Sequence, residues 1–419
     1  MTLPPTAEPG KDDRDTAQAL DDVEELLKRI PGARRLVTEV QDLRALLVDR
    51  RPPRIAVVGR RGVGKSSLAN ALLGVEVAPV GAVEDTTAAP GWYDVTTDGK
   101  AIRWLDTPGL RAGAEPSRRE VVERALRAER PDVVLLLVKA SQVDAGIDED
   151  LDEARALLTA VAVDRKAPPP VIAVLTKVDE LAGARVKAPP FDADTARREN
   201  IAAAVTLLRS HLDRVKLEVK DVVPVATWQR FKDGVRVTDW RWNLETLGAV
   251  IFEALPNNAQ VEAARALERG RVIRRRVAMR IVGTATSVSV VIGATPLPVA
   301  DLALLLPLQS AMLTSLVYVS GRGLGPRAVS EWLGAMGLNV SSALGLREAA
   351  RAALKLIPGI GATISGAVAG TGTWALGVAA VRYFFDGGTA ESSRAAFDDA
   401  VRDGPPPDEG PGGADEKSG

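Results

Sequence analysis

The sequence predicts an α/β domain with a doubly wound, mostly parallel six-stranded sheet, followed by an all-α apolar domain. Short β-branched runs alternate with helix-like stretches between residues 54 and 256, which is typical of strands joined by helices. Farther along, residues 281–300, 302–321 and 356–381 contain no charged residue and are rich in Val, Leu, Ala and Gly. The length of 419 residues fits two folded units with flexible ends.

Composition excludes several kinds of function. The chain has 54 basic and 55 acidic residues, so no overall field attracts nucleic acid, and we predict no nucleic-acid partner. It has no cysteine, which excludes disulfides and thiolate chemistry. The single histidine, His211, excludes histidine metal clusters, and we expect this residue to be structural or at the surface. The polar, Pro-rich N-terminus does not resemble a secretory signal, so we expect a cytoplasmic protein.

The two ends of the chain differ in composition from the segment that follows the N-terminal end. Residues 1–18 and 386–419 are poor in apolar residues and rich in Pro, Gly and acid, which predicts disordered tails. Between residues 19 and 50, apolar residues recur at helical spacing on both sides of a Pro-Gly break. This pattern predicts two amphipathic helices that pack against another element.

Six strands follow, with the domain expected to span residues 51–256. The strand segments read RIAVVG, GWYDVTT, AIRWLD, VVLLLVKA, VIAVLTK and VVPVAT. A helical run that ends at Pro256 closes the domain, which leaves residues 257–385 for the apolar helical domain. The insert from Trp228 to Trp242 contains an Asp-Gly turn and predicts a hairpin that covers the sheet edge.

A phosphate-binding motif follows the first strand. The segment fits G-x-x-x-x-G-K-[ST] and is assigned to nucleotide binding through Gly59, Arg60, Arg61, Gly62, Val63, Gly64, Lys65, Ser66 and Ser67. Glycines let backbone N–H groups surround phosphate oxygens, and the next helix directs its positive end at them. We expect Lys65 to neutralise the β and γ phosphates and the Ser66 hydroxyl to ligate Mg²⁺.

Two further segments identify the base and the switch. An apolar strand is followed by Thr176, Lys177 and Asp179. The Asp179 carboxylate can accept hydrogen bonds from both guanine donors, a pair that adenine does not offer. The aliphatic stem of Lys177 can cover the base. Asp106 begins the sequence Asp-Thr-Pro-Gly after the third strand, where it can hold a water bound to Mg²⁺, and the Gly109 N–H can meet the γ-phosphate.

Two weaker assignments complete the site. Thr86 and Thr87 lie between the first helix and the second strand, and either can complete the coordination of Mg²⁺. Ala226 follows the sixth strand, where its backbone N–H can reach guanine O6. The catalytic assignments are Lys65, Thr86, Thr87 and Gly109.

With these motifs in order, the domain resembles G domains of the Era and TrmE-like kind, which implies GTP/GDP and Mg²⁺ as ligands and hydrolysis of GTP. The sequence departs from that pattern at three positions. Thr176 replaces the commoner Asn, a change also found in Rho proteins and interferon-inducible GTPases. Leu110 stands where Ras-like proteins have a water-orienting glutamine, which implies slow turnover without an activator. Gly62 replaces the Asn of potassium-activated relatives.

Arg60 and Arg61 lie inside the phosphate loop, so either can act as an arginine finger in cis or across a homodimer of G domains. The alternative is that both are solvated at its rim. The sequence does not decide between these roles.

The charge-free runs allow two interpretations. Each is close to the length that spans a bilayer, and seven Arg between residues 265 and 280 suit anionic headgroups, so membrane contact is predicted for residues 265–385. Pro296, Pro298, Pro307 and Pro358 interrupt the runs, and frequent small residues also suit a tightly packed soluble bundle. Residues 275–385 resemble the YcjF-like domain of unknown function, which implies a bacterial GTPase at the inner face of the cell membrane.

Three functions remain open at this stage. The first is a nucleotide-controlled switch that acts on the apolar domain and on an unknown protein effector or activator. The second is a self-assembling effector that remodels membranes or forms pores. The third, allowed by Leu110, is a GTP-binding scaffold without catalysis.

Overall fold

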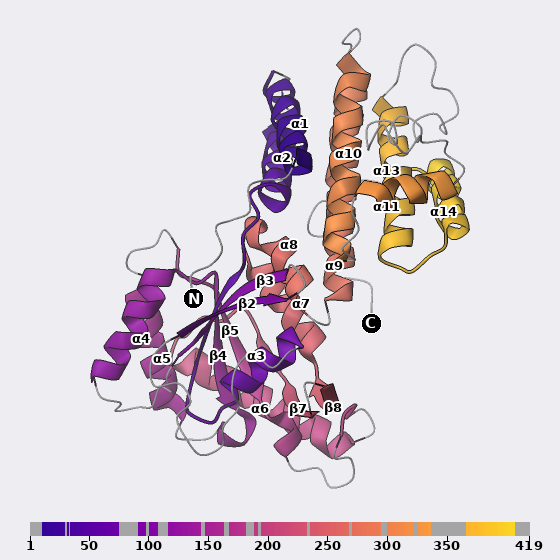
Figure 1. The fold of residues 1–419 in the computed structure, drawn as a ribbon. Coiled ribbons are helices and arrows are strands. Elements are labelled where there is room, and N and C mark those ends of the chain that lie inside the picture. Colours follow the sequence, from indigo (N-terminus) through magenta and orange to yellow (C-terminus); the bar gives the residue numbers. More distant parts are fainter. Residues whose placement is uncertain are drawn as a thin grey trace. The chain divides into compact units, whose positions relative to one another are not determined.

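The computed structural model divides the chain into two compact units, one formed by Arg51–Ile273 and one by Met1–Arg50 together with Arg274–Gly419 (Figure 1). The structure describes residues 11–29, 32, 34–74, 91–97, 100–107, 116–143, 147–162, 167–181, 188–191, 194–232, 235–267, 270–294, 300–321, 326–336 and 366–406. The first of these units is called the G unit below and the second the helical unit.

The G unit is built on one six-stranded sheet with the order β2-β3-β1-β4-β5-β6. The strands are β1 Arg54–Gly59, β2 Gly91–Thr97, β3 Lys100–Asp106, β4 Val133–Lys139, β5 Val171–Thr176 and β6 Val222–Pro224. All neighbouring pairs are parallel except β2 and β3, which are antiparallel. The predicted doubly wound, mostly parallel sheet is therefore confirmed.

Helices cover both faces of this sheet, which explains why β4 and β5 are apolar at almost every position. One face packs against α4 Pro116–Glu129, α5 Ile147–Ala162 and α6 Thr195–Arg214. On the other side of the sheet lie α3 Lys65–Leu73, α7 Leu244–Ala254 and α8 Asn257–Ala266 (Figure 1). Short 3₁₀ turns follow β4 and β5, at Ala140–Gln142 and Val178–Glu180.

A separate hairpin follows the sixth strand, as the sequence predicts. It consists of β7 Ala226–Lys232 and β8 Val235–Trp242, which pair antiparallel outside the main sheet. The described contacts of this hairpin include α3: Arg241 Nη1 donates to the Ala71 carbonyl oxygen at 2.9 Å, and Arg236 Nη2 donates to that of Gly74 at 2.9 Å. The hairpin thus caps the C-terminal end of the helix that starts at the phosphate loop.

The helical unit is built from residues at both ends of the chain. Its helices are α1 Lys11–Lys28, α2 Arg34–Leu47, α10 Ala300–Ser320, α11 Pro326–Ala335, α13 Gly366–Phe384, α14 Ala390–Asp403 and most of α9 Arg271–Ala294. The buried face of α1 packs against α10. The Arg50 guanidinium lies 3.9 Å from the centroid of the Tyr318 ring, and Arg280 pairs with Asp42 at 3.8 Å. The partner of α1 is therefore α10, while α2 contacts α1 and, through Asp42, α9.

Small residues bring α9 and α13 together. A Cβ added at Gly366 would lie 2.5 Å from the Val290 carbonyl oxygen, and one added at Gly377 would lie 2.4 Å from Val282 Cγ1. A buried polar chain crosses the same region, where Gln309 Nε2 donates to Thr373 Oγ1 at 3.0 Å and Thr373 donates to Ser289 Oγ at 2.9 Å. Of the described helices, α9 is long and apolar enough to cross a membrane, and 50% of its most apolar window is buried inside the structure.

Four expectations need correction. The G unit extends to Ile273 rather than Pro256, because α8 packs against β3. Helix α1 begins at Lys11, inside the segment expected to be a tail. Helix α14 lies in the other expected tail and buries Phe397 against the unit. Helix α10 continues through Pro307, whereas the other three prolines lie outside the described residues.

Candidate functional site

The phosphate loop connects the end of β1 to the start of α3. Gly62 and Gly64 have φ angles of 73° and 101°, which residues with a side chain rarely adopt. A Cβ at Gly59 would lie 2.6 Å from the carbonyl oxygen of Leu137 on β4. Gly62 and Gly64 therefore allow two turns of the backbone, and Gly59 allows β4 to approach the loop closely.

Lys65 is the first residue of α3, and its side chain folds back over the loop. Its Nζ lies 3.3 Å from each of the carbonyl oxygens of Gly59 and Arg60. Ser66 and Ser67 follow in the first turn and are partly buried. A cation, two hydroxyls and the positive end of a helix thus gather at one loop, an arrangement suited to phosphates and an associated Mg²⁺.

Thr176 ties the phosphate loop to the base motif. Its buried hydroxyl lies 2.7 Å from the Val63 carbonyl oxygen and 3.2 Å from that of Val138. One hydroxyl proton can serve only one acceptor at a time, so the shorter contact carries the hydrogen bond. The threonine that replaces the commoner asparagine therefore links residues 113 positions apart in the sequence.

The base motif continues in the 3₁₀ turn after β5. Lys177 has φ 58°, and its left-handed conformation turns the chain so that Asp179 follows in the turn. Burial raises the pKa of the Asp179 carboxyl above its usual value, and a backbone hydrogen bond and the charges of Lys177 and Arg197 oppose that effect. A half-buried carboxylate of this kind suits recognition of the two guanine donors.

Ala226 lies at the junction between β6 and the hairpin, and it is fully buried. The neighbouring Val225 donates its N–H to the Leu175 carbonyl oxygen at 2.8 Å and accepts from the Val178 N–H at 3.4 Å. Asn243, which the sequence analysis missed, donates from Nδ2 to the Pro224 carbonyl oxygen at 2.8 Å. The only sequence signal for Asn243 was its place immediately before a helical run.

The switch motif is described only in part. Thr107 donates its hydroxyl to the Val57 carbonyl oxygen at 2.7 Å, which fixes the end of β3 against β1. Asp106 is the last residue of β3 and lies opposite Val57 in the parallel register. Thr86, Thr87, Gly109 and Leu110 lie outside the described residues, as does the side chain of Asp106.

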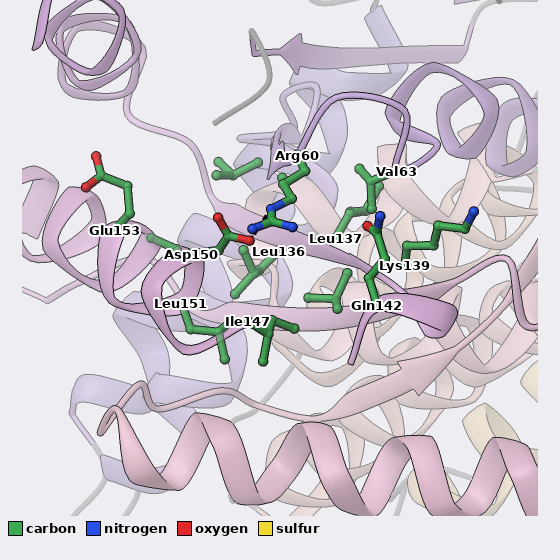
Figure 2. Close-up of a pocket in the computed structure, with 14 residues that line it drawn as sticks. Arg60, Val63, Leu136, Leu137, Lys139, Gln142, Ile147, Asp150, Leu151 and Glu153 are labelled. Carbon is green, nitrogen blue, oxygen red and sulfur yellow. Dashed lines mark ion pairs between the residues drawn. The ribbon is translucent and has the colours of Figure 1, made fainter. Parts of the chain in front are cut away.

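Arg60 forms an ion pair with Asp150 on α5 (Figure 2). Beside this pair, β1, β4 and α5 line an apolar pocket below the phosphate loop. Its lining includes the apolar residues Val58, Val63, Leu136, Ile147 and Leu151. The pairing with Asp150 does not favour an arginine-finger role for Arg60, whereas Arg61 is exposed at the loop.

His211 has a structural environment, as expected. Its Nδ1 lies 2.5 Å from Asp148 Oδ1, and Arg214 Nη1 donates to Asp148 Oδ2 at 2.6 Å. These hydrogen bonds lower the pKa of the Asp148 carboxyl. The cluster links α5 to α6, outside the loops that carry the motifs.

Comparison with known proteins agrees with this geometry. Residues 54–177 match the family model described as 50S ribosome-binding GTPase. The chain is 45% identical over 93 residues to GTPase Der of Chloroflexus aurantiacus, covering 21% of each protein. It is 30% identical over 230 residues to GTPase Era of Xanthomonas campestris pv. campestris, covering 52% of this chain and 74% of Era.

Among solved structures, the chain is similar to Toc33 from Arabidopsis thaliana in complex with Mg²⁺ and GMPPNP. The sequence identity is 19%, the TM-score is 0.36, and the match covers 54% of this chain and 95% of Toc33. The chain thus spans most of Era but only about a fifth of Der, at 74% and 21% of their lengths. The phosphate loop, the base motif and the match to Era together establish that the chain belongs to the family of P-loop GTPases.

Proposed function

We propose that the protein is a slow GTPase switch whose nucleotide state acts on the helical unit at the inner face of a bacterial cell membrane. The hydrogen bond from Thr176 to the Val63 carbonyl oxygen carries this proposal, because it joins the phosphate loop to the base loop in one preformed site. Preformed donors need little reorganisation when charge develops on a phosphate.

In this proposal each motif residue has one role. Lys65 leaves the loop carbonyls to contact the β and γ phosphates, and Ser66 and Asp106 hold Mg²⁺ directly or through water. Asp179 and the Ala226 N–H select guanine. Thr86 or Thr87 completes the metal site, and Gly109 contacts the γ-phosphate, so loss of that phosphate releases both loops.

The path to the helical unit runs through α3. Residues Ala71 and Leu72 at the end of this helix line a small cavity with Gly248 and Ile273. Ile273 is 4% exposed and lies in the first turn of α9, which continues to Ala294 in the helical unit. A shift of α3 on phosphate loss therefore displaces the anchored start of α9.

Membrane association is supported by the helical unit alone. Helix α9 carries no charged residue after Arg280, and its contacts with α13 use glycines, as in helix pairs within bilayers. The resemblance of residues 275–385 to the YcjF-like domain is part of the same proposal. An effector or activator protein is expected to bind the surface of the G unit that changes with the bound nucleotide.

Hydrolysis is tested by phosphate release from GTP with the full chain. Lys65→Ala is expected to abolish turnover because it removes the positive charge that neutralises the β and γ phosphates. Lys220→Ala, a change at an exposed lysine of the same unit, is the matched control. Turnover of the parent at background, no faster than that of Lys65→Ala, would show that the protein is a GTP-binding scaffold instead. Equal turnover above background would contradict the role of Lys65.

Membrane association is tested separately, by washing bacterial membranes that contain the full chain with alkaline carbonate. We expect the protein to stay with the membranes. Complete release into the supernatant would contradict membrane insertion and leave the switch to act on a soluble partner.

A further inference from the structure

The β7–β8 hairpin presents a face that the proposed GTPase cycle does not use. The antiparallel register pairs Trp228 with Trp240, Arg230 with Thr238 and Lys232 with Val235, so these side chains share one face. We call this set the outer face: Trp228, Arg230, Lys232, Val235, Thr238 and Trp240. The opposite face carries Arg236 and Arg241, whose contacts with α3 fix the hairpin in the G unit.

The outer face is unusually apolar for a surface. Among the described residues, seven large apolar side chains are exposed, and three of them lie on this hairpin. Trp228 is 44% exposed and Val235 is 65% exposed, while Val237 beside the β-bulge is 47% exposed. The rings of Trp228 and Trp240 are 4.5 Å apart between centroids, so they form one aromatic surface. Such a cluster on a short hairpin indicates a binding surface.

The charges on the outer face have one sign. Arg230 and Lys232 are exposed, and neither forms an ion pair with any described residue. Asp239 lies on the opposite face, where Arg241 Nη2 donates to it at 2.6 Å. Over residues 226–242 the sequence has four basic and two acidic residues, which gives a net charge of +2. The partner of this face should therefore be anionic.

We propose that the outer face binds an anionic lipid surface. Tryptophan rings favour the boundary between headgroups and acyl chains, and lysine and arginine attract anionic headgroups. Val235, the most exposed of the three apolar side chains, is an aliphatic group suited to acyl chains. Single-stranded nucleic acid is a poorer match because the rings of Trp228 and Trp240 pack against each other, which covers part of the aromatic surface on which bases would stack.

This contact goes beyond the proposed switch, because it requires neither the apolar helices nor hydrolysis. It also bears on the switch. The hairpin begins at Ala226 in the base loop and holds the end of α3 through two arginines. Lipid bound to the outer face therefore contacts an element that is joined to the base loop and to the C-terminal end of α3, the helix that starts at the phosphate loop.

A single engineered cysteine tests the lipid contact in the full-length protein, which has no cysteine of its own. Val235→Cys is labelled with an environment-sensitive fluorophore and mixed with vesicles of phosphatidylcholine alone or with phosphatidylglycerol. We expect the emission to shift to the blue only with the anionic vesicles. The same label at Ala202→Cys, an exposed position on α6, is expected not to respond.

Variants that lack the basic residues of the outer face provide a second test of the lipid contact. Each basic residue near an anionic surface contributes roughly a fivefold gain in attachment, so Arg230→Gln with Lys232→Gln should weaken the response about 25-fold. Arg124→Gln with Arg198→Gln removes two exposed cations from other helices and should change nothing. If the label at position 235 stays in water while the full chain binds the vesicles, the lipid proposal is wrong and the proposed function stands. A response to a single-stranded oligonucleotide but not to vesicles would also overturn it, in favour of a nucleic-acid partner.

Discussion

In the phosphate loop, Gly62 and Gly64 adopt left-handed backbone conformations, whereas in α13 Gly366 and Gly377 lie on ordinary helix against α9. The loop glycines shape a backbone that receives a ligand. The helix glycines remove side chains so that two helices can approach. The same residue type is thus recognisable from a motif in the G unit but only from a packed structure in the helical unit. Substitutions should separate the two uses, with effects on ligand binding in one unit and on stability in the other.

The largest expected effect is on base selection. Asp179→Asn replaces a carboxylate with an amide whose N–H₂ group repels the guanine donors. Because two charge-assisted hydrogen bonds are lost, affinity for GTP should fall at least about 100-fold, while affinity for xanthine nucleotides should rise. Competition binding with GTP and XTP measures both. Unchanged GTP affinity would remove Asp179 from the base site.

The next effect is on the link between the two nucleotide loops. Thr176→Val keeps the shape of the side chain and leaves the buried Val63 carbonyl oxygen without its donor. We expect a loss of about 1–3 kcal/mol in the free energy of unfolding, with weaker nucleotide binding. Thr176→Asn restores a donor and should recover part of the binding. Equal behaviour of the parent and Thr176→Val in chemical denaturation would show that the hydroxyl does not hold the loop.

In the helical unit, the sharpest test is Gly366→Ala. The new Cβ would lie 2.5 Å from the Val290 carbonyl oxygen, so α9 and α13 must separate. Overpacking of this kind costs about 1–3 kcal/mol, and nucleotide affinity should not change. Thermal unfolding followed by circular dichroism, beside a nucleotide titration, checks both parts. A loss of affinity without loss of stability would contradict the division between the units.

An effect of similar size, confined to stability, is expected from the buried polar chain of the helical unit. Thr373→Val leaves Gln309 Nε2 without its acceptor, which should cost about 1–3 kcal/mol of unfolding free energy. Adding Gln309→Leu removes the stranded donor as well and should recover much of that loss. Denaturant unfolding of the single and double variants gives the comparison. No recovery in the double variant would mean that Gln309 and Thr373 contribute to stability independently of each other.

The smallest effect concerns acid stability in the G unit. Hydrogen bonds from His211 and Arg214 lower the pKa of Asp148 below its ordinary value of 3.8, so the folded state favours the carboxylate. The stability that results is present above the ordinary pKa and is lost as pH falls through the lowered one. Asp148→Asn removes this contribution, so it should lower stability at neutral pH and flatten the dependence of stability on pH in that acidic window, where the two proteins converge. Parallel acid unfolding curves for the two proteins would contradict this assignment.

The sequence was sufficient for the sheet and the two nucleotide loops because those elements have local signatures. Alternating strands and helices predict a doubly wound, mostly parallel sheet, and glycine spacing predicts the phosphate loop. The partner of an amphipathic helix has no such signature, which is why α10 could not be assigned to α1 in advance. Helix α14 was missed because its first and last turns are polar and only a few side chains, such as Phe397, reach the core.

Side-chain contacts across the fold were also beyond the sequence. The hydrogen bond from Asn243 to the Pro224 carbonyl oxygen joins residues 19 positions apart, and no pattern along the chain marks it. Arg60 was considered for catalysis because it lies inside the motif, yet its guanidinium pairs with Asp150 on a helix far along the chain. Only the packing of α5 beside the phosphate loop reveals that partner.

Hydrogen exchange of the full chain, with GDP or with GMPPNP bound, tests the central claim most directly. A switch that acts through α3 and Ile273 predicts altered protection in the phosphate loop and also in α9 and its contacts in the helical unit. Changes confined to residues 51–273 would show that the nucleotide state does not reach the helical unit, and the account of a coupled switch would be wrong.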